Sequence, residues 1–254
     1  MDLGLSGKRA IVTGGSRGIG RAIAERLVAE GCSVGICARN GDEVANAVTT
    51  LQAGSQAKVC GLAADVGDTV AVKQFVDAAA DALGGIDIVV ANVSALGGMP
   101  NEETWRASME LDMLGTVRVV EAALPWLEKS GAGAIVAISS TAALEAFGGA
   151  RPYNAIKAAV INYVSNLATA LAPKGIRANT VSPGTIYFDD GVWGKRKREM
   201  PAAYEAALAN NPMGRMGTPA EVANVVAFAA SPAASFVTGA NLVVDGGFTR
   251  RVQY

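Results

Sequence analysis

The sequence contains no histidine, and this absence removes several kinds of site at once. Histidine is the usual general base of hydrolytic triads and the commonest ligand of catalytic and structural zinc. Proton transfer must therefore depend on tyrosine, lysine, serine or a carboxylate, and we expect no metal site.

Cysteines, excess charge and long apolar runs are also scarce. Cys32, Cys37 and Cys60 form no CxxC pair, and their odd number indicates free thiols in a reducing cytoplasm. The 22 basic and 23 acidic residues leave a net charge of −1, so the chain lacks the positive field of a nucleic-acid-binding protein. No apolar run reaches about 18 residues, and the start of the chain has no signal-peptide pattern. We expect a cytoplasmic protein that binds neither nucleic acid nor membrane.

Half of the 254 residues are hydrophobic, which is enough for a sizeable core. Short β-branched runs alternate with longer segments of helical period, a pattern typical of a parallel sheet covered by helices on both faces. We expect one Rossmann-like, doubly wound α/β domain over residues 1–254, with about seven strands. The predicted strands are 10–13, 33–37, 58–61, 86–91, 133–139, 177–181 and 241–244. The predicted helices are 18–30, 41–53, 68–82, 102–127, 152–172 and 219–230.

The stretch from about 185 to 215 interrupts this alternation. It carries aromatic residues and the basic run from Lys195 to Arg198. Insertions after a late strand lie beside the carboxyl ends of the strands, where ligands bind. We therefore expect a substrate lid over 185–215. The basic run is interpreted as a solvated face of this lid, with binding of a phosphate-bearing substrate as the alternative.

A glycine-rich turn, Thr13 to Gly20, joins the first predicted strand to the first predicted helix. Glycines there let a pyrophosphate approach backbone amides at the helix N-terminus. The spacing GxxxGxG differs from the GxGxxG dinucleotide fingerprint, and a plain strand–helix turn is the alternative. The turn residues expected at the cofactor are Gly14, Ser16, Arg17, Gly18, Ile19 and Gly20.

The second predicted strand ends without the acidic residue that NAD enzymes use to bind the ribose hydroxyls. Arg39 follows this strand, and Arg17 lies in the glycine turn. Two guanidinium groups suit a ribose 2′-phosphate, because arginine pairs with phosphate through two hydrogen bonds. We therefore predict NADP(H) rather than NAD(H), the alternative being two solvated arginines. Asp65 follows the third strand and can accept a hydrogen bond from the adenine amine, the alternative being an ordinary helix N-cap.

Tyr153 and Lys157 lie four residues apart in a predicted helix and so share one face. Ser140 ends the fifth predicted strand, whose carboxyl edge this helix follows. A nearby ammonium favours phenolate and makes a tyrosine usable as a general acid–base near neutrality. Ser140 can meanwhile donate a hydrogen bond to the substrate oxygen.

These motifs, in this order, resemble the classical short-chain dehydrogenase/reductase family over nearly the whole chain. The resemblance implies hydride transfer between nicotinamide C4 and a carbinol or carbonyl carbon, catalysed by Ser140, Tyr153 and Lys157. It also implies that Lys157 holds the nicotinamide ribose and that the protein is a homotetramer or homodimer. Further cofactor contacts that it implies are Asp65, Val66, Asn92, Tyr153, Lys157, Pro183, Gly184 and Ile186.

Three positions depart from the family pattern. Val93 and Ser94 follow Asn92 where the family has alanine and glycine. Asp112 takes the place of the family's fourth catalytic residue, an asparagine, and either stabilises the Lys157 ammonium or competes for it. Phe188 stands where a threonine often contacts the carboxamide. The residues expected at the substrate, with core packing as the alternative for the apolar ones, are Ser94, Leu144, Phe147, Phe188 and Trp193.

The leading hypothesis is an NADP(H)-dependent oxidoreductase that interconverts a ketone and a secondary alcohol, with Tyr153 as general acid–base. A 3-oxoacyl thioester reductase of the same family and a catalytically weak NADP(H)-binding regulator are the alternatives. A methyltransferase is disfavoured because it would leave Tyr153, Lys157 and Arg39 without a role.

Overall fold

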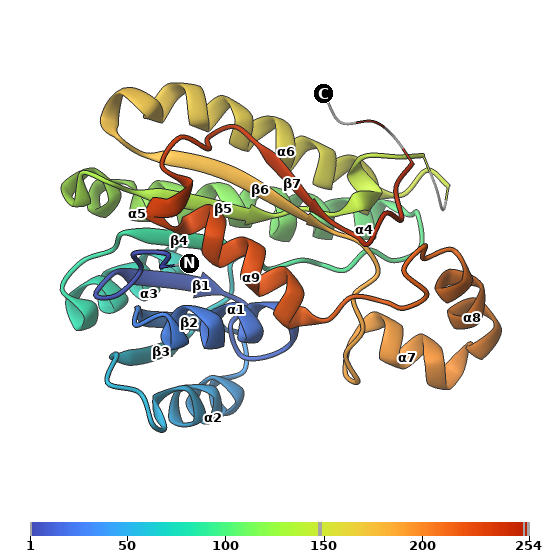
Figure 1. The fold of residues 1–254 in the computed structure, drawn as a ribbon, viewed down its shortest axis with the longest axis horizontal. Helices are drawn as coiled ribbons and strands as arrows, with labels where there is room; N and C mark the ends of the chain where they lie inside the picture. The colour runs from blue at the N-terminus through green and yellow to red at the C-terminus, as the bar shows by residue number, and fades with distance from the viewer. Residues whose placement is uncertain (1, 147–148, 251, 253–254) are drawn as a thin grey trace.

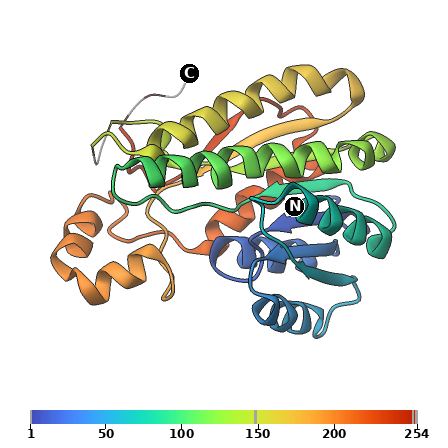
Figure 2. The ribbon, with the colours of Figure 1, turned by 180° about the vertical axis from the view of Figure 1, so that it is seen from behind.

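The computed structural model describes residues 2–146, 149–250 and 252. Seven parallel strands form one sheet in the order β3-β2-β1-β4-β5-β6-β7, with helices on both faces (Figures 1 and 2). The Rossmann-like, doubly wound single domain is therefore confirmed. The strands are β1 Arg9–Thr13, β2 Ser33–Ala38, β3 Val59–Ala63, β4 Ile88–Ala91, β5 Ala134–Ile138, β6 Arg177–Pro183 and β7 Asn241–Val244.

Two cores form because the central strands are buried on both faces. Ala10 and Val12 of β1 belong to one apolar cluster and Ile11 to the other, as the period of two along a strand requires. The first cluster includes α1 Gly18–Ala29, α2 Gly41–Gln52 and α9 Pro219–Ala230. The second includes α3 Thr69–Leu83, α5 Gly115–Ser130 and α6 Pro152–Leu171.

The prediction of one α-helix over 102–127 was wrong in its middle. The structure has α4 Glu102–Ser108, then a π-helical segment Met109–Leu114, and then α5. Apolar spacing follows which residues face the core, but it does not reveal the wider turn that a π-helix makes. Such turns occur frequently at functional sites, and this one carries Asp112.

The expected lid contains two helices that were not predicted, α7 Val192–Glu199 and α8 Pro201–Ala209. Figure 1 shows them set apart from the helices that cover the sheet. Buried Thr185 donates a hydrogen bond to the Oδ1 atom of buried Asn211 at 2.8 Å, which fastens the two ends of this segment together. The short 3₁₀ turns are Thr141–Ala143, Ala172–Lys174 and Pro232–Ala234.

We expected no membrane-spanning apolar stretch, yet α6 and the following 3₁₀ turn, Pro152–Lys174, are long and apolar enough for one. One such helix is weak support for a span, because core helices of soluble proteins pass the same test. Val160 and Val164 pack in the second core, and Lys157 is buried on the same helix. Core packing therefore accounts for the apolar residues on the buried face of α6.

The three cysteines are free thiols, as expected. Cys32 and Cys37 are buried and Cys60 is half-buried. Burial raises the pKa of the Cys32 and Cys37 thiols to about 12, so neither is a reactive thiolate near neutrality.

A buried carboxylate ties the sheet to α5. Asp87 accepts hydrogen bonds from Nε and Nη2 of Arg9, both at 2.8 Å, and from the Ser130 hydroxyl. Burial by itself raises the pKa of Asp87, but the bonds from Arg9 and Ser130 outweigh it and leave the pKa below its ordinary value. Asp87 therefore stabilises the fold above its unfolded-state pKa of about 4, and this contribution is lost as the pH falls through its native pKa.

We expect Asp87→Asn to lower the free energy of unfolding by about 2 kcal/mol at pH 7, because Arg9 loses its charged partner. The difference from the parent protein should shrink as the pH falls from about 4 toward the lower native pKa of Asp87, below which the carboxyl is neutral in the folded protein as well. Urea unfolding of the variant and the parent protein, at pH 7 and again in acid, measures this difference in the free energy of unfolding. Asp77→Asn removes an exposed partner of Lys73 and serves as the control; an equal loss in both variants would contradict the role of Asp87.

Candidate active site

A cleft of about 450 Å³ is lined by residues at the carboxyl ends of the strands. It lies where the strand order reverses between β1 and β4, the usual place for a ligand in a doubly wound fold. All the residues expected at the cofactor line this cleft. They are Gly14, Ser16, Arg17, Gly18, Ile19, Gly20, Arg39, Asp65, Val66, Asn92, Tyr153, Lys157, Pro183, Gly184 and Ile186.

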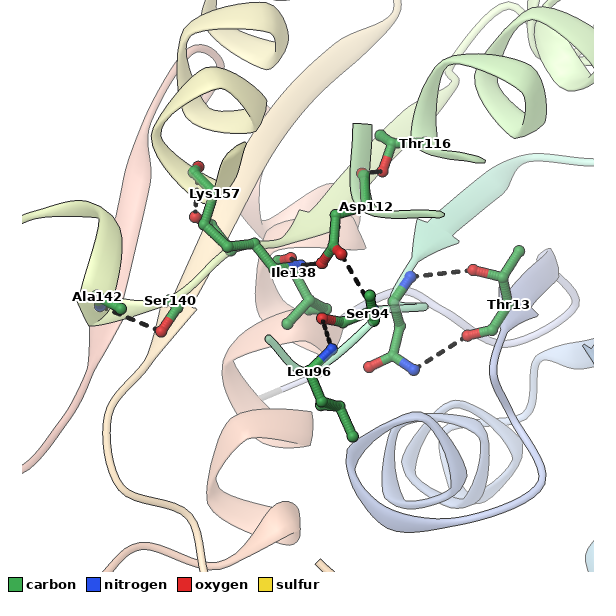
Figure 3. A network of polar contacts seen from close by, with 12 residues as sticks. Thr13, Ser94, Leu96, Asp112, Thr116, Ile138, Ser140, Ala142 and Lys157 are labelled. Carbon is green, nitrogen blue, oxygen red and sulfur yellow. Dashed lines mark hydrogen bonds and ion pairs between the residues drawn. The ribbon is translucent and has the colours of Figure 1, made fainter. Parts of the chain in front are cut away.

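The glycines of the turn stand where a side chain would be strained or would clash. Gly14 and Gly18 have φ of +66° and +57°, a region that side chains disfavour. A Cβ atom at Gly20 would lie 2.1 Å from the Gly14 carbonyl oxygen. Asn92 fastens the turn to the end of β4, since its backbone amide donates to Thr13 Oγ1 at 3.0 Å and its Nδ2 donates to the Thr13 carbonyl at 3.0 Å (Figure 3).

Arg17, in the turn after β1, and Arg39, directly after β2, are exposed at one end of the cleft. Asn40 and Glu43 at the start of α2 line the same end. The Ser16 hydroxyl donates to the Glu43 carboxylate at 3.2 Å. Sequence reasoning did not place Glu43 in the site, because an acidic residue in the first turn of a helix is usually explained by its interaction with the helix dipole.

Ser140, Tyr153 and Lys157 line the other end of the cleft. The Lys157 ammonium is buried and donates to the Ile138 carbonyl at 3.0 Å. It lies 5.8 Å from the centre of the Tyr153 ring, so the two side chains share one face of α6, as their spacing predicts. Ser140 caps the 3₁₀ turn after β5, with its Oγ atom accepting from the Ala142 amide at 3.1 Å (Figure 3).

Asp112 lies behind Lys157 and is not among the described residues that line the cleft. Its Oδ1 is 2.9 Å from the Lys157 ammonium, and both side chains are almost fully buried. Its Oδ2 accepts from the Ala95 amide at 3.0 Å, and its backbone carbonyl accepts from the Thr116 hydroxyl at 2.7 Å (Figure 3). Asp112 therefore contacts the ammonium rather than the space in which a ligand fits.

The expected substrate residues are placed differently from one another. Ser94, Phe188 and Trp193 line the cleft, Leu144 is not among its described lining residues, and Phe147 lies outside the described residues. The Phe188 ring lies against the glycine turn, because a Cβ atom added at Gly18 would be 2.7 Å from it. Phe188, which was predicted to contact the substrate, therefore also lies against the part of the cleft expected to bind the cofactor.

Leu96 is a lining residue that sequence reasoning missed. It follows β4, is 61% exposed, and has a φ of +59°. Its amide donates to Ser94 Oγ at 2.9 Å, which supports this strained conformation (Figure 3). No sequence signal marks a leucine that adopts a left-handed conformation. No cluster of three or more potential metal ligands occurs in residues 2–146, 149–250 and 252.

Known proteins match the chain over its whole length. A family model described as enoyl-(acyl carrier protein) reductase matches residues 14–249. Isoepoxydon dehydrogenase patN of Penicillium expansum is 37% identical over 257 residues, which cover 100% of this chain and 99% of that protein. The crystal structure of L-sorbose reductase from Gluconobacter frateurii, with NADPH and L-sorbose, superposes with a TM-score of 0.91 at 31% identity, covering 99% of this chain and 100% of that one. A 7α-hydroxysteroid dehydrogenase with NADH and 7-oxo glycochenodeoxycholic acid gives 0.89 at 32% identity, covering 97% and 96%.

Proposed function

The chain belongs to the short-chain dehydrogenase/reductase family of oxidoreductases, and we propose that it interconverts a ketone and a secondary alcohol with NADP(H). The observation that carries the proposal is the placement of Ser140, Tyr153 and Lys157 at one end of a cleft whose other end holds Arg17 and Arg39.

The cleft fits a dinucleotide. At Gly14, Gly18 and Gly20 the turn presents only backbone to the cleft, and α1 begins there at Gly18, so the amides of its first turn would meet a pyrophosphate. Arg17 and Arg39 would hold the 2′-phosphate, and Asp65 and Val66 would flank the adenine. When bound, the cofactor supplies or accepts a hydride at nicotinamide C4.

The chain's own residues supply the proton chemistry. Ser140 donates a hydrogen bond to the reacting oxygen, and Tyr153 gives that oxygen a proton in reduction and takes one in oxidation. The Lys157 ammonium, 5.8 Å from the Tyr153 ring centre, stabilises the phenolate form. Asp112 acts through Lys157 by keeping this buried ammonium paired and in place.

We also propose that residues 185–215 form a lid over the substrate and that the protein is a cytoplasmic homotetramer or homodimer. The Phe188 and Trp193 side chains in the cleft support the lid. A 3-oxoacyl thioester reductase remains the second candidate because α7 carries four consecutive basic residues, Lys195 to Arg198, beside the cleft.

A screen of chemically diverse ketones with NADPH, and of the matching alcohols with NADP⁺, tests the reaction. Turnover of secondary-alcohol and ketone pairs is the expected result. Failure across all substrate classes, with NADPH still raising the melting temperature, would favour the NADP(H)-binding regulator instead. Stabilisation by S-adenosylmethionine but not by NADPH would exclude both.

The cofactor preference makes a separate prediction. Arg39→Ala should raise the Kd for NADPH by roughly 10- to 100-fold, because it removes charge-assisted hydrogen bonds to the 2′-phosphate. The Kd for NADH should change by less than about threefold, since NADH lacks that phosphate. Fluorescence titration measures both. Arg106→Ala, which removes an exposed arginine of α4, is the control; equal losses for the two nucleotides would contradict a phosphate site at Arg39.

A further inference from the structure

The Glu43 carboxylate lies at the end of the cleft where two arginines would attract an anion. It lines the same end of the cleft as Arg17 and Arg39. Its side chain reaches back to the glycine turn, where its Oε2 accepts from the Ser16 hydroxyl at 3.2 Å. Two positive charges and one negative charge therefore face whatever ribose group binds at this end.

A role in capping α2 does not require the Glu43 side chain. Asn40 is the N-cap, and its side-chain oxygen accepts from the Asp42 amide at 3.0 Å and the Glu43 amide at 3.2 Å. An acid in the first turn also interacts favourably with the helix dipole, and Asp42 already provides one. Glu43, not Asp42, is among the lining residues.

The two kinds of ribose interact oppositely with a carboxylate. A ribose 2′-phosphate carries close to two negative charges near neutral pH, so Glu43 repels it and offsets part of the attraction of the two arginines. The free 2′- and 3′-hydroxyls of NAD(H) are donors, for which a carboxylate is the preferred acceptor.

We propose that Glu43 is a specificity-determining residue: its carboxylate binds the ribose hydroxyls of NAD(H), opposes the 2′-phosphate, and so allows the protein to use both nucleotides with only a modest preference for NADP(H). This inference rests on the proposed function, because it requires a dinucleotide in the cleft.

The test compares Glu43→Gln with Asp42→Asn, which removes the same charge from the neighbouring position of the same helix. Kd values for NADPH and NADH are measured by fluorescence titration at one low ionic strength. Glu43→Gln should tighten NADPH binding by about tenfold, because it removes the repulsion between one carboxylate and two phosphate charges in a largely aqueous site. It should weaken NADH binding by a few-fold, whereas Asp42→Asn should change the NADH-to-NADPH Kd ratio by less than about twofold.

Salt provides a second readout. The gain in NADPH affinity should fall at about 0.5 M salt, because exposed charges are screened at that concentration. An unchanged Kd ratio in Glu43→Gln, or an equal change in Asp42→Asn, would overturn the role of Glu43 while the proposed function stands. A parent protein that binds neither nucleotide would overturn both. Circular dichroism on each variant confirms that the exposed substitutions leave the fold intact.

Discussion

Tyr153→Phe should lower kcat for ketone reduction by about 10³-fold, because it removes the phenolic proton donor and keeps the ring. The Kd for NADPH should change little, since the Lys157 ammonium keeps its contacts with Ile138 and Asp112. Single-turnover reduction followed at the NADPH absorbance, together with fluorescence titration of NADPH, separates chemistry from binding.

Tyr163→Phe is the matched control for this experiment. Tyr163 lies on the same helix, but it packs against the second core, and burial raises the pKa of its phenol to about 12. It should tolerate the loss of its hydroxyl with full activity. If Tyr153→Phe kept more than about a tenth of the parent rate, general acid catalysis by this residue would be refuted, since such catalysis contributes at least about 10²-fold.

The sheet was predictable because its strands are buried on both faces. The segment Ile88–Ala91 is wholly apolar, and such short runs separated by helical periods have few other interpretations. The spacing of Tyr153 and Lys157 was equally informative, because residues four apart on a helix share one face whatever the rest of the chain does. The glycines of the turn were also a local signal, since they mark places where backbone must approach closely.

The wider turn around Asp112 was not predictable in this way. A π-helical segment differs from an α-helix by its hydrogen bonds, and no residue type in Met109–Leu114 requires it. The sequence showed a carboxylate in place of an asparagine but left open whether it stabilises Lys157 or competes for it. The ion pair between Asp112 and Lys157, 2.9 Å long with both side chains buried, depends on tertiary structure, because it forms when this segment packs on α6.

Glu43 and Leu96 illustrate two other limits. Glu43 does lie in the first turn of α2, as the usual interpretation of an acid at a helix start requires. Its contact with Ser16, however, depends on how α2 packs against the glycine turn. The left-handed conformation of Leu96 is imposed by the loop that joins β4 to α4. The contact of Glu43 with Ser16, 27 positions apart in the chain, is therefore not encoded by sequence neighbours.

The Asp112 carboxylate serves two neighbours, an ion-pair partner at Oδ1 and a hydrogen-bond donor at Oδ2. Oδ1 faces the Lys157 ammonium and Oδ2 accepts from the Ala95 amide. An asparagine is neutral, so Asp112→Asn removes the counter-charge of the buried Lys157 ammonium, although the contact of that ammonium with the Ile138 carbonyl is kept. We expect kcat to fall by roughly 10- to 100-fold, because the ammonium is held less firmly, and the free energy of unfolding to fall by about 2 kcal/mol, because a buried ion pair is lost.

Asp112→Ala should be more severe, at about 3–5 kcal/mol of unfolding free energy, because it leaves the Lys157 ammonium buried without a counter-charge. Adding Lys157→Met removes that charge, and the double variant should regain stability while remaining inactive. Urea unfolding and NADPH-coupled rates measure the two effects. Glu110→Gln, in the same π-helical segment but paired with Arg118 near the surface, is the control and should change both little. Parent-like stability and rate in Asp112→Ala would show that Lys157 finds another partner, and the positioning role of Asp112 would then be wrong.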